Sequence, residues 1–218
     1  MGPLSTPHLE TISPEMKNLL AWIGGQDFSA RFYLAGGTAL AIQLGHRKSA
    51  DLDFFSESDE IHDRTRAELI KGFSQRHAEV IESVDGNLVL LADNIHVGFF
   101  SYGYGLLEAC STLENVNLAS ILDIGLMKLD AVIGRGSRKD FYDLYVVARQ
   151  IPLHDLLQAG QKKYPAVRDF ALMSVESLVL FDNARRDVQP ELLTDMPWQQ
   201  VENYFVEQAK ALGKIWFE

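Results

Sequence analysis

The amino-acid sequence predicts an α+β protein whose first half carries a β-sheet and whose second half is helical. Two observations in the first half favour this class: a short apolar strand enters Gly36-Gly37 and then a helix, and three strand-like runs follow between residues 79 and 102. The third observation is that strand patterns cease beyond residue 105, where four segments with helical periodicity begin. We therefore expect a sheet first and helices after it.

The elements of the first half follow from apolar spacing and from the residues that interrupt it. Pro14 is expected to open a helix, because proline is favoured in the first turn, and Gly45 is expected to end a later, shorter one. The expected elements are a helix at 14–23, a strand at 32–35, a helix at 38–44, a strand at 51–55 and a helix at 62–76.

The remaining elements are separated by turn-forming pairs and by proline or glycine. Asp85-Gly86 and Asp93-Asn94 divide three strand-like runs, which predicts an antiparallel meander. The expected strands are 79–83, 87–91 and 95–102, and the expected helices are 119–134, 138–150, 165–184 and 197–212.

Composition bounds the kind of protein. Hydrophobic residues make up 47% of the 218 residues and charged residues 23%, which is typical of a globular chain. No apolar run approaches the ~18 residues of a membrane span, and the first residues lack a basic and then apolar leader, so we expect a cytoplasmic protein with no membrane contact. A single cysteine argues against a disulfide or a zinc cluster. The net charge of −10 opposes non-specific binding to nucleic acid.

The first candidate site is the glycine pair that ends the strand at 32–35. A strand that passes through Gly36-Gly37 into a helix places backbone N–H groups at the helix N-terminus, where they stabilise a phosphate. Thr38 can cap this helix or donate its hydroxyl to a phosphate. The pair alone is equally explained by a structural turn.

The segment Asp51-Leu52-Asp53 strengthens this hypothesis. Residues two apart on a strand point to the same face, so Asp51 and Asp53 stand side by side, and Ser49 shares their face. Two neighbouring carboxylates need a cation, and a hard divalent ion such as Mg²⁺ is suitable. The alternative is a pair of exposed surface aspartates. A metal beside a phosphate-binding turn suits phosphoryl or nucleotidyl transfer.

These motifs resemble a known signature. Gly36-Gly37, followed after thirteen residues by Asp51-Leu52-Asp53, is similar to the signature of the polymerase-β-like nucleotidyltransferase superfamily. More narrowly, LAGGTALAIQLGHRKSADLDFF resembles the AbiEii/AbiGii toxin family. The resemblance implies a mixed sheet with flanking helices, followed by a C-terminal helical bundle.

A second candidate site lies on the helices at 119–134 and 138–150. Lys128 falls on an otherwise apolar stripe, so it is expected either to meet a triphosphate or to pair with an internal carboxylate. Ser137 and Asp140 fit a capping box, which gives Asp140 a structural role, whereas Asp143 falls on the buried side and needs a cation or donor. Lys128 is one candidate partner of Asp143.

The family resemblance extends to this second site, because Met127-Lys128-Leu129 and Asp140-Phe141-Tyr142-Asp143-Leu144 match its lysine and Asp-x-x-Asp-Leu motifs. It implies that Lys128 and Asp140 complete a site in which Asp51 and Asp53 hold Mg²⁺ or Mn²⁺ and Gly37 and Thr38 face phosphate.

The general base stays open. Many polymerase-β-like enzymes carry a third acid on a later strand, and the segment at 95–100 has none. Asp140, Asp143 and His96 are candidates, although His96 is equally explained as an edge-strand histidine without a catalytic role.

Two further features have alternatives. Arg47 is a candidate phosphate ligand, because its guanidinium offers a fork of donors. The aromatic side chains of Phe99, Phe100, Tyr102 and Tyr104 can be interpreted as a platform for stacking bases, but their alternation favours core and sheet packing.

The sequence thus predicts a Mg²⁺-dependent nucleotidyltransferase that uses a nucleoside triphosphate. The resemblance implies the toxin of a bacterial toxin–antitoxin or abortive-infection system, with an RNA end such as tRNA, or a protein, as acceptor and a cognate antitoxin as partner. The alternatives are a nucleotide-binding module without transfer and a small-molecule adenylyltransferase of the antibiotic-modifying kind. We expect the α/β core at residues 1–112 and a helical domain that completes the site at 113–218.

Overall fold

A computed structural model describes residues 2–217 of the chain. It confirms the predicted α+β class: all seven strands of the described residues lie before residue 119, together with three α-helices, and only helices follow. The chain divides into two compact units, Met1–Ser120 and Ile121–Glu218, so the division lies eight residues beyond the expected position.

The first unit contains a seven-stranded mixed sheet with the strand order β3-β4-β5-β2-β1-β7-β6. Strands β2 and β5 are parallel, as are β1 and β7, and the other neighbours are antiparallel. The strands are β1 (Tyr33–Leu34), β2 (Asp51–Ser56), β3 (Glu79–Val84), β4 (Asn87–Ala92), β5 (Ile95–Ser101), β6 (Ser111–Leu113) and β7 (Val116–Leu118).

The predicted meander is confirmed, because β3, β4 and β5 pair consecutively and antiparallel. The expectation that strands cease beyond residue 105 was wrong. Strands β6 and β7 form a hairpin around Glu114 and Asn115, whose φ angles of 49° and 63° give the left-handed turn that joins two such short strands. Three-residue strands are too short to produce a clear alternation.

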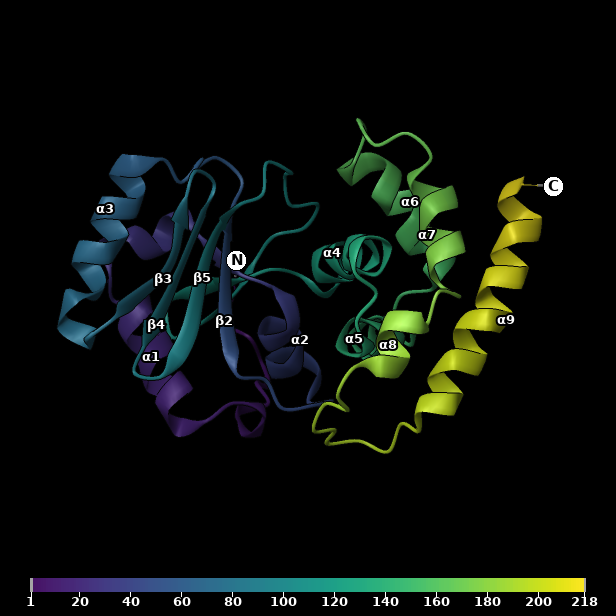
Figure 1. Cartoon of the computed structure of the whole chain (residues 1–218), viewed down its shortest axis with the longest axis horizontal. Helices are drawn as coiled ribbons and strands as arrows, with labels where there is room; N and C mark the ends of the chain where they lie inside the picture. Colours follow the sequence, from purple (N-terminus) through teal and green to yellow (C-terminus); the bar gives the residue numbers. More distant parts are fainter. Residues whose placement is uncertain (1, 218) are drawn as a thin grey trace. The chain divides into compact units, whose positions relative to one another are not determined.

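Three α-helices accompany the sheet: α1 (Pro14–Gly24), α2 (Gly36–Leu44) and α3 (Asp63–Gly72). Figure 1 shows α1 and α3 beside the β3, β4 and β5 part of the sheet and α2 beside β2. The core on the α1 side is aromatic: the ring of Phe99 contacts Phe28, Phe32, Phe54 and Phe73. Along β2 every second side chain is buried, and the half-buried side chains of Asp51, Asp53 and Phe55 lie on the opposite face of the sheet.

The second unit is helical. Helix α4 packs against α5, α6 and α7, and α9 packs against α5 and α7. In Figure 1, α9 is the long C-terminal helix drawn in yellow. The helices are α4 (Ile121–Gly134), α5 (Arg138–Ala148), α6 (Leu153–Lys163), α7 (Phe170–Ser177), α8 (Asp182–Arg186) and α9 (Trp198–Phe217).

Two features of this unit differ from the sequence prediction. Helix α6 was missed, although Pro152 before it and the buried Leu153, Leu156 and Leu157 give a helical spacing. The single helix expected at 165–184 is two helices, α7 and α8, because the chain leaves helical geometry between them. Among residues 2–217, no helix has the length and apolar character needed to cross a bilayer.

Candidate active site

The turn between β1 and α2 packs directly against the carboxylate of Asp53. Gly36 has a φ of +66°, a left-handed conformation that favours glycine, and it begins α2 with only Ala35 between it and the end of β1. A Cβ atom added at Gly36 would lie 3.3 Å from Asp53 Oδ2. The backbone N–H of Ala35 donates to the carbonyl of Asp53 at 3.0 Å, which fixes the strand beside the turn. The helix N-terminus and the carboxylate therefore form one local structure.

The two aspartates of β2 share a face, as predicted. Leu52 and Phe54 are buried, whereas Asp51 and Asp53 alternate with them and are half-buried. This placement gives two carboxylates on the polar face of the sheet, at the end of β2 nearest the α2 turn.

Thr38 joins the turn to the same strand. Its hydroxyl donates to the backbone carbonyl of Asp51 and lies 2.7 Å from the Ser49 hydroxyl. Thr38 is buried, and Ser49 precedes β2 rather than lying within it. Arg47 is also buried, and its guanidinium donates to the carbonyl of Lys48 at 2.9 Å and to Ser49 at 3.5 Å. In this structure these three side chains stabilise the loop that leads into β2.

Strand β5 lies beside β2 and contributes His96 and Gly98 to the same face. The register pairs Asp51 with His96 and Asp53 with Gly98. His96 Nδ1 lies 3.8 Å from Asp51 Oδ1, and both side chains are about half exposed. The interpretation of His96 as an edge-strand residue was wrong, because β5 lies between β4 and β2.

The residues present fit a divalent cation held partly by substrate. Within the described part of the chain, no three His, Cys, Asp or Glu side chains form a complete metal-binding group. Mg²⁺ is commonly bound by one or two carboxylates, with substrate phosphates and water supplying the other ligands. Asp51 and Asp53 provide this oxygen donor set, and the helix N-terminus beside them is suited to phosphate.

A second charged cluster lies in the helical unit, around Lys128 of α4. Lys128 Nζ lies 3.0 Å from Asp140 Oδ1 and 2.7 Å from Asp143 Oδ2, and all three side chains are buried. The expectation that Asp143 needs a cation, with Lys128 as a candidate, is confirmed. The alternative that Lys128 pairs with internal carboxylates is the arrangement seen here.

Asp140 has more partners than the sequence indicated. The Arg135 guanidinium donates to both of its carboxylate oxygens, at 2.7 and 2.8 Å, and the Ser137 hydroxyl donates at 2.5 Å. The predicted capping box is therefore wrong in detail, because the Ser137 side chain does not cap the backbone. Burial acts to raise the pKa of Asp140, but the hydrogen bonds from Arg135 and the charge of Lys128 hold this pKa well below its usual range.

The candidate site residues predicted from the sequence thus come together in two separate groups. Gly36, Thr38, Ser49, Asp51 and Asp53 come together in the first unit. The Lys128, Asp140 and Asp143 group forms in the second.

Sequence reasoning missed two further contributors. The bidentate contact from Arg135 to Asp140 was missed, although their spacing of five residues across the turn between α4 and α5 made it possible. The place of Gly98 opposite Asp53 was missed because it depends on the pairing of distant strands.

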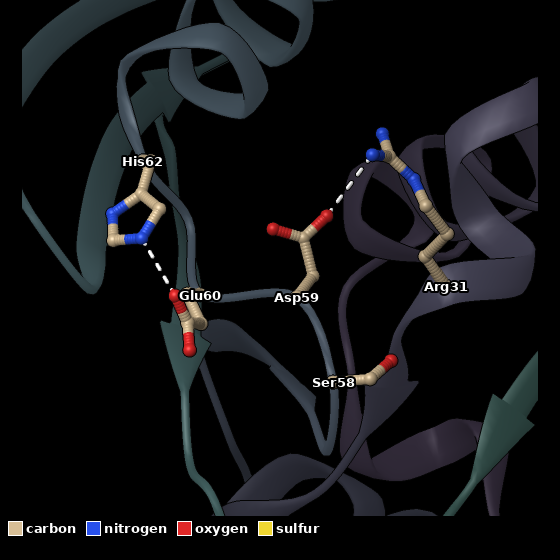
Figure 2. Close-up of a pocket in the computed structure, with 5 residues that line it drawn as sticks. All are labelled: Arg31, Ser58, Asp59, Glu60 and His62. Atoms are coloured by element: carbon tan, nitrogen blue, oxygen red, sulfur yellow. Dashed lines mark hydrogen bonds and ion pairs between the residues drawn. The ribbon is translucent and has the colours of Figure 1, made fainter.

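A shallow pocket after β2 has a different character. Figure 2 shows Asp59 directed toward Arg31 and His62 directed toward Glu60. The Arg31–Asp59 and His62–Glu60 distances are 3.0 and 2.6 Å, and Arg31 also lies 2.9 Å from Glu68. Three carboxylates, of Asp59, Glu60 and Glu68, outnumber the single guanidinium of Arg31, so the pocket is less suited to phosphate than the α2 turn.

Comparison with known proteins covers most of the chain. The sequence profile of a family described as "Nucleotidyl transferase AbiEii toxin, Type IV TA system" matches residues 19–208. An uncharacterized protein of Aquifex aeolicus (strain VF5) is 38% identical over 183 residues, which cover 82% of this chain and 86% of that protein.

Solved structures share the fold at low sequence identity. MenT4, a nucleotidyltransferase toxin from Mycobacterium tuberculosis H37Rv, aligns with a TM-score of 0.60 and 16% identity over 91% of this chain and 81% of that chain. JHP933 from Helicobacter pylori aligns with a TM-score of 0.52 and 14% identity over 94% of both chains. The antibiotic-resistance factor ANT(2'')-Ia aligns with a TM-score of 0.52 and 16% identity over 70% of this chain and 94% of that chain. These alignments confirm the predicted polymerase-β-like fold.

Proposed function

The chain belongs to the AbiEii nucleotidyltransferase toxin family, and from this premise we propose that it transfers a nucleotidyl group from a nucleoside triphosphate to the end of an RNA, using Mg²⁺ held by Asp51 and Asp53. The observation that supports the proposal is the close approach of the α2 turn to Asp53: a helix N-terminus, which is suited to phosphate, lies beside a carboxylate pair.

The proposed reaction is an in-line displacement at the α-phosphorus. An acceptor hydroxyl attacks this phosphorus, the bond to the bridging oxygen breaks, and pyrophosphate leaves while the hydroxyl proton is lost to a base. The N–H groups at the start of α2 bind the phosphates, and Gly36 lets them approach closely. Thr38 fixes the turn to β2 through the Asp51 carbonyl.

Asp51 and Asp53 would hold Mg²⁺ or Mn²⁺. The bound ion supplies charge neutralisation for the triphosphate and the departing pyrophosphate. The two carboxylates also keep the triphosphate away from β2 when no cation is present, because like charges repel. Nucleotide binding is therefore expected to depend on the cation.

We include Lys128 in the proposed reaction, with Asp140 and Asp143 as positioning groups. An ammonium has three N–H donors, and the two carboxylates fix its direction by accepting hydrogen bonds at short range. The low pKa of Asp140 keeps this carboxylate charged and makes it a poor proton acceptor. Asp140 is thus better suited to orienting Lys128 than to serving as the base.

The test of the proposal is transfer of label from each of the four nucleoside triphosphates, carrying ³²P at the α-position, in the presence of Mg²⁺. Parallel reactions contain total RNA, a purified tRNA pool, protein extract or an aminoglycoside. We expect label on RNA, and we expect EDTA to abolish it. Label on the aminoglycoside alone would contradict the RNA acceptor and support a small-molecule adenylyltransferase. The antibiotic-resistance factor ANT(2'')-Ia shares the fold of this chain.

Binding without turnover is the other outcome that would change the proposal. Metal-dependent binding of a triphosphate in calorimetry, with no transfer to any acceptor, would support a nucleotide-binding module. The type IV toxin–antitoxin family implies a cognate antitoxin. We propose that expression of this chain slows growth of a bacterial host and that co-expression of the antitoxin restores it.

A further inference from the structure

A ring surface lies on the same side of the sheet as Asp51 and Asp53. It is formed by Phe55 of β2, Phe100 of β5, and Tyr102 and Tyr104 in the loop that follows β5. Phe100 and Phe55 are neighbours in the register, with ring centroids 5.2 Å apart. Tyr102 contacts Phe55 at 5.6 Å and Tyr104 at 5.3 Å. All four rings are half-buried, so part of each is accessible. In contrast, Phe99 points to the opposite face and is fully buried in the aromatic core.

Gly98 brings this ring surface up to the carboxylates. A Cβ atom at Gly98 would lie 2.4 Å from Phe100 Cε2 and 2.5 Å from Cζ, so the Phe100 ring lies over the glycine backbone. The same added atom would lie 3.2 Å from Asp53 Oδ1. The ring edge and the carboxylate therefore border one space. A glycine in a strand interior weakens the strand, and here its absent side chain makes room for the ring.

The geometry of in-line transfer indicates which ligand reaches this surface. In the proposed reaction the triphosphate binds at the α2 turn, which follows β1, so pyrophosphate would leave on that side. Attack occurs from the opposite side of the phosphorus. In the sheet, β5 and β1 flank β2 on opposite sides. With the triphosphate in this place, the attacking acceptor would approach over β5 and the ring surface.

We propose that the ring surface stacks the unpaired terminal nucleobase of the RNA acceptor, with Phe100 as the principal contact. The inference rests on the proposed function, and it adds the residues that hold the acceptor. Stacking on aromatic side chains is independent of base identity and is the usual way in which proteins hold unpaired bases.

Negative charge at the β3 side of the same face favours a short unpaired RNA end over a long strand. Beyond β5, the register continues through Leu91 and Val89 of β4 to Glu79 and Glu82 of β3. These two glutamates are exposed and repel a phosphate backbone that crosses the sheet. The row through Phe100 itself continues through Asn87 to Val84 and carries no charge, so a terminal base can stack on Phe100 without meeting these glutamates.

The experiment measures stacking directly, without turnover. An RNA hairpin with a short unpaired 3′ tail ends in 2-aminopurine, whose fluorescence is quenched when it stacks. It is titrated with wild type, Phe100→Leu and Phe100→Trp in Mg²⁺ without triphosphate. Wild type and Phe100→Trp are expected to quench the probe, and Phe100→Leu is expected to weaken binding about five- to 150-fold, since stacking contributes about 1–3 kcal/mol per base. A blunt hairpin carrying 2-aminopurine within its stem should bind no variant.

The matched control is Ile81→Ala, which removes another exposed apolar side chain from the same sheet, on β3. It should bind the tailed probe as wild type does. Circular dichroism melts verify folding, and Tyr102→Leu replaces Phe100→Leu if that variant unfolds. Equal quenching by wild type and both leucine variants would overturn the inference.

Transfer kinetics show whether the rings stack the base of the RNA acceptor or the base of the triphosphate. Phe100→Leu should raise the KM for RNA and leave the KM for the triphosphate unchanged. A rise in the triphosphate KM alone would overturn the inference and assign the rings to the nucleotide. Quenching that depends on Phe100 without any transfer to RNA would support the stacking surface and contradict the proposed function alone.

Discussion

Gly36 and Asp53 are packed so closely that a methyl group on Gly36 would lie 3.3 Å from the Asp53 carboxylate. Gly36 also has a positive φ of 66°, which an L-residue with a side chain adopts only at a cost. Glycine at this position therefore has two effects. It adopts the positive φ of the turn into α2, and it leaves room for the carboxylate of Asp53.

The first prediction follows from this contact. Gly36→Ala should reduce transfer at least about tenfold beyond its effect on stability, because the added methyl crowds Asp53 and the phosphate site, and strain at positive φ costs about 1 kcal/mol. Gly86→Ala is the matched control: Gly86 has a φ of +82°, and a Cβ there meets only Ser101 at 3.9 Å. Transfer per folded molecule should fall for Gly36→Ala and stay normal for Gly86→Ala. Equal losses would refute a special role for the turn.

The second prediction compares two buried lysines of the helical unit. Lys128 pairs with Asp140 and Asp143, and Lys163 lies 2.7 Å from Asp123 with both side chains fully buried. Replacing either lysine with methionine leaves buried carboxylate charge and should cost about 3–5 kcal/mol of stability. Only Lys128→Met should also lower the rate constant of transfer per folded molecule, measured in single-turnover reactions and corrected for the folded fraction from urea unfolding. A wild-type rate constant of transfer for folded Lys128→Met would show that this cluster stabilises the fold and takes no part in transfer.

The third prediction concerns the acid stability that Asp140 contributes. The folded-state pKa of Asp140 lies below its unfolded value of about 4, so its contribution is present above pH 4 and is lost as the pH falls toward the folded-state pKa. Asp140→Asn should destabilise the protein by about 3 kcal/mol at pH 7. The difference from wild type should shrink in urea unfolding curves measured at decreasing pH from 5 to 3. A difference that stays constant over this range would contradict the assigned pKa shift.

The fourth prediction concerns the salt dependence of RNA binding. The chain has a net charge of −10, and the proposed acceptor contact is a stacked base rather than a row of phosphates. The logarithm of the binding constant should therefore fall with the logarithm of salt concentration with a slope no steeper than about −2. Titrations of the tailed hairpin at several KCl concentrations measure this slope. A steep slope would indicate a phosphate-binding surface and argue against stacking as the main contact.

Much of the first site could be predicted because its signals are local. The glycine pair that ends β1 and the alternation of Asp51 and Asp53 with Leu52 and Phe54 require only neighbouring residues. Helical periodicity also shows that Lys128 lies on the apolar stripe of α4 and that Asp143 lies on the buried side of α5. These patterns identified both groups of candidate residues before their contacts were known.

The features that were missed depend on pairing between distant segments or on very short elements. Nothing near Gly98 in the sequence shows that it lies opposite Asp53, since the register of β5 with β2 joins residues far apart in the chain. Alternation separates Phe99 from Phe100, but only the structure shows the Phe100 ring lying over Gly98. The hairpin of β6 and β7 turns at Glu114 and Asn115 rather than at the usual Asn-Gly, so its turn was not recognised.

The central claim is that Asp51 and Asp53 hold the metal for nucleotidyl transfer, and one measurement tests it most directly. Asp51→Asn, Asp53→Asn and the control Asp27→Asn, at an exposed aspartate of the same unit, are compared in Mg²⁺-dependent transfer of α-³²P-labelled nucleotide to RNA. Asparagine keeps the shape of the side chain and removes its charge, so both site variants should lose at least about 100-fold of activity, and the control should lose none. Transfer at the wild-type rate by folded Asp51→Asn and Asp53→Asn would contradict the account.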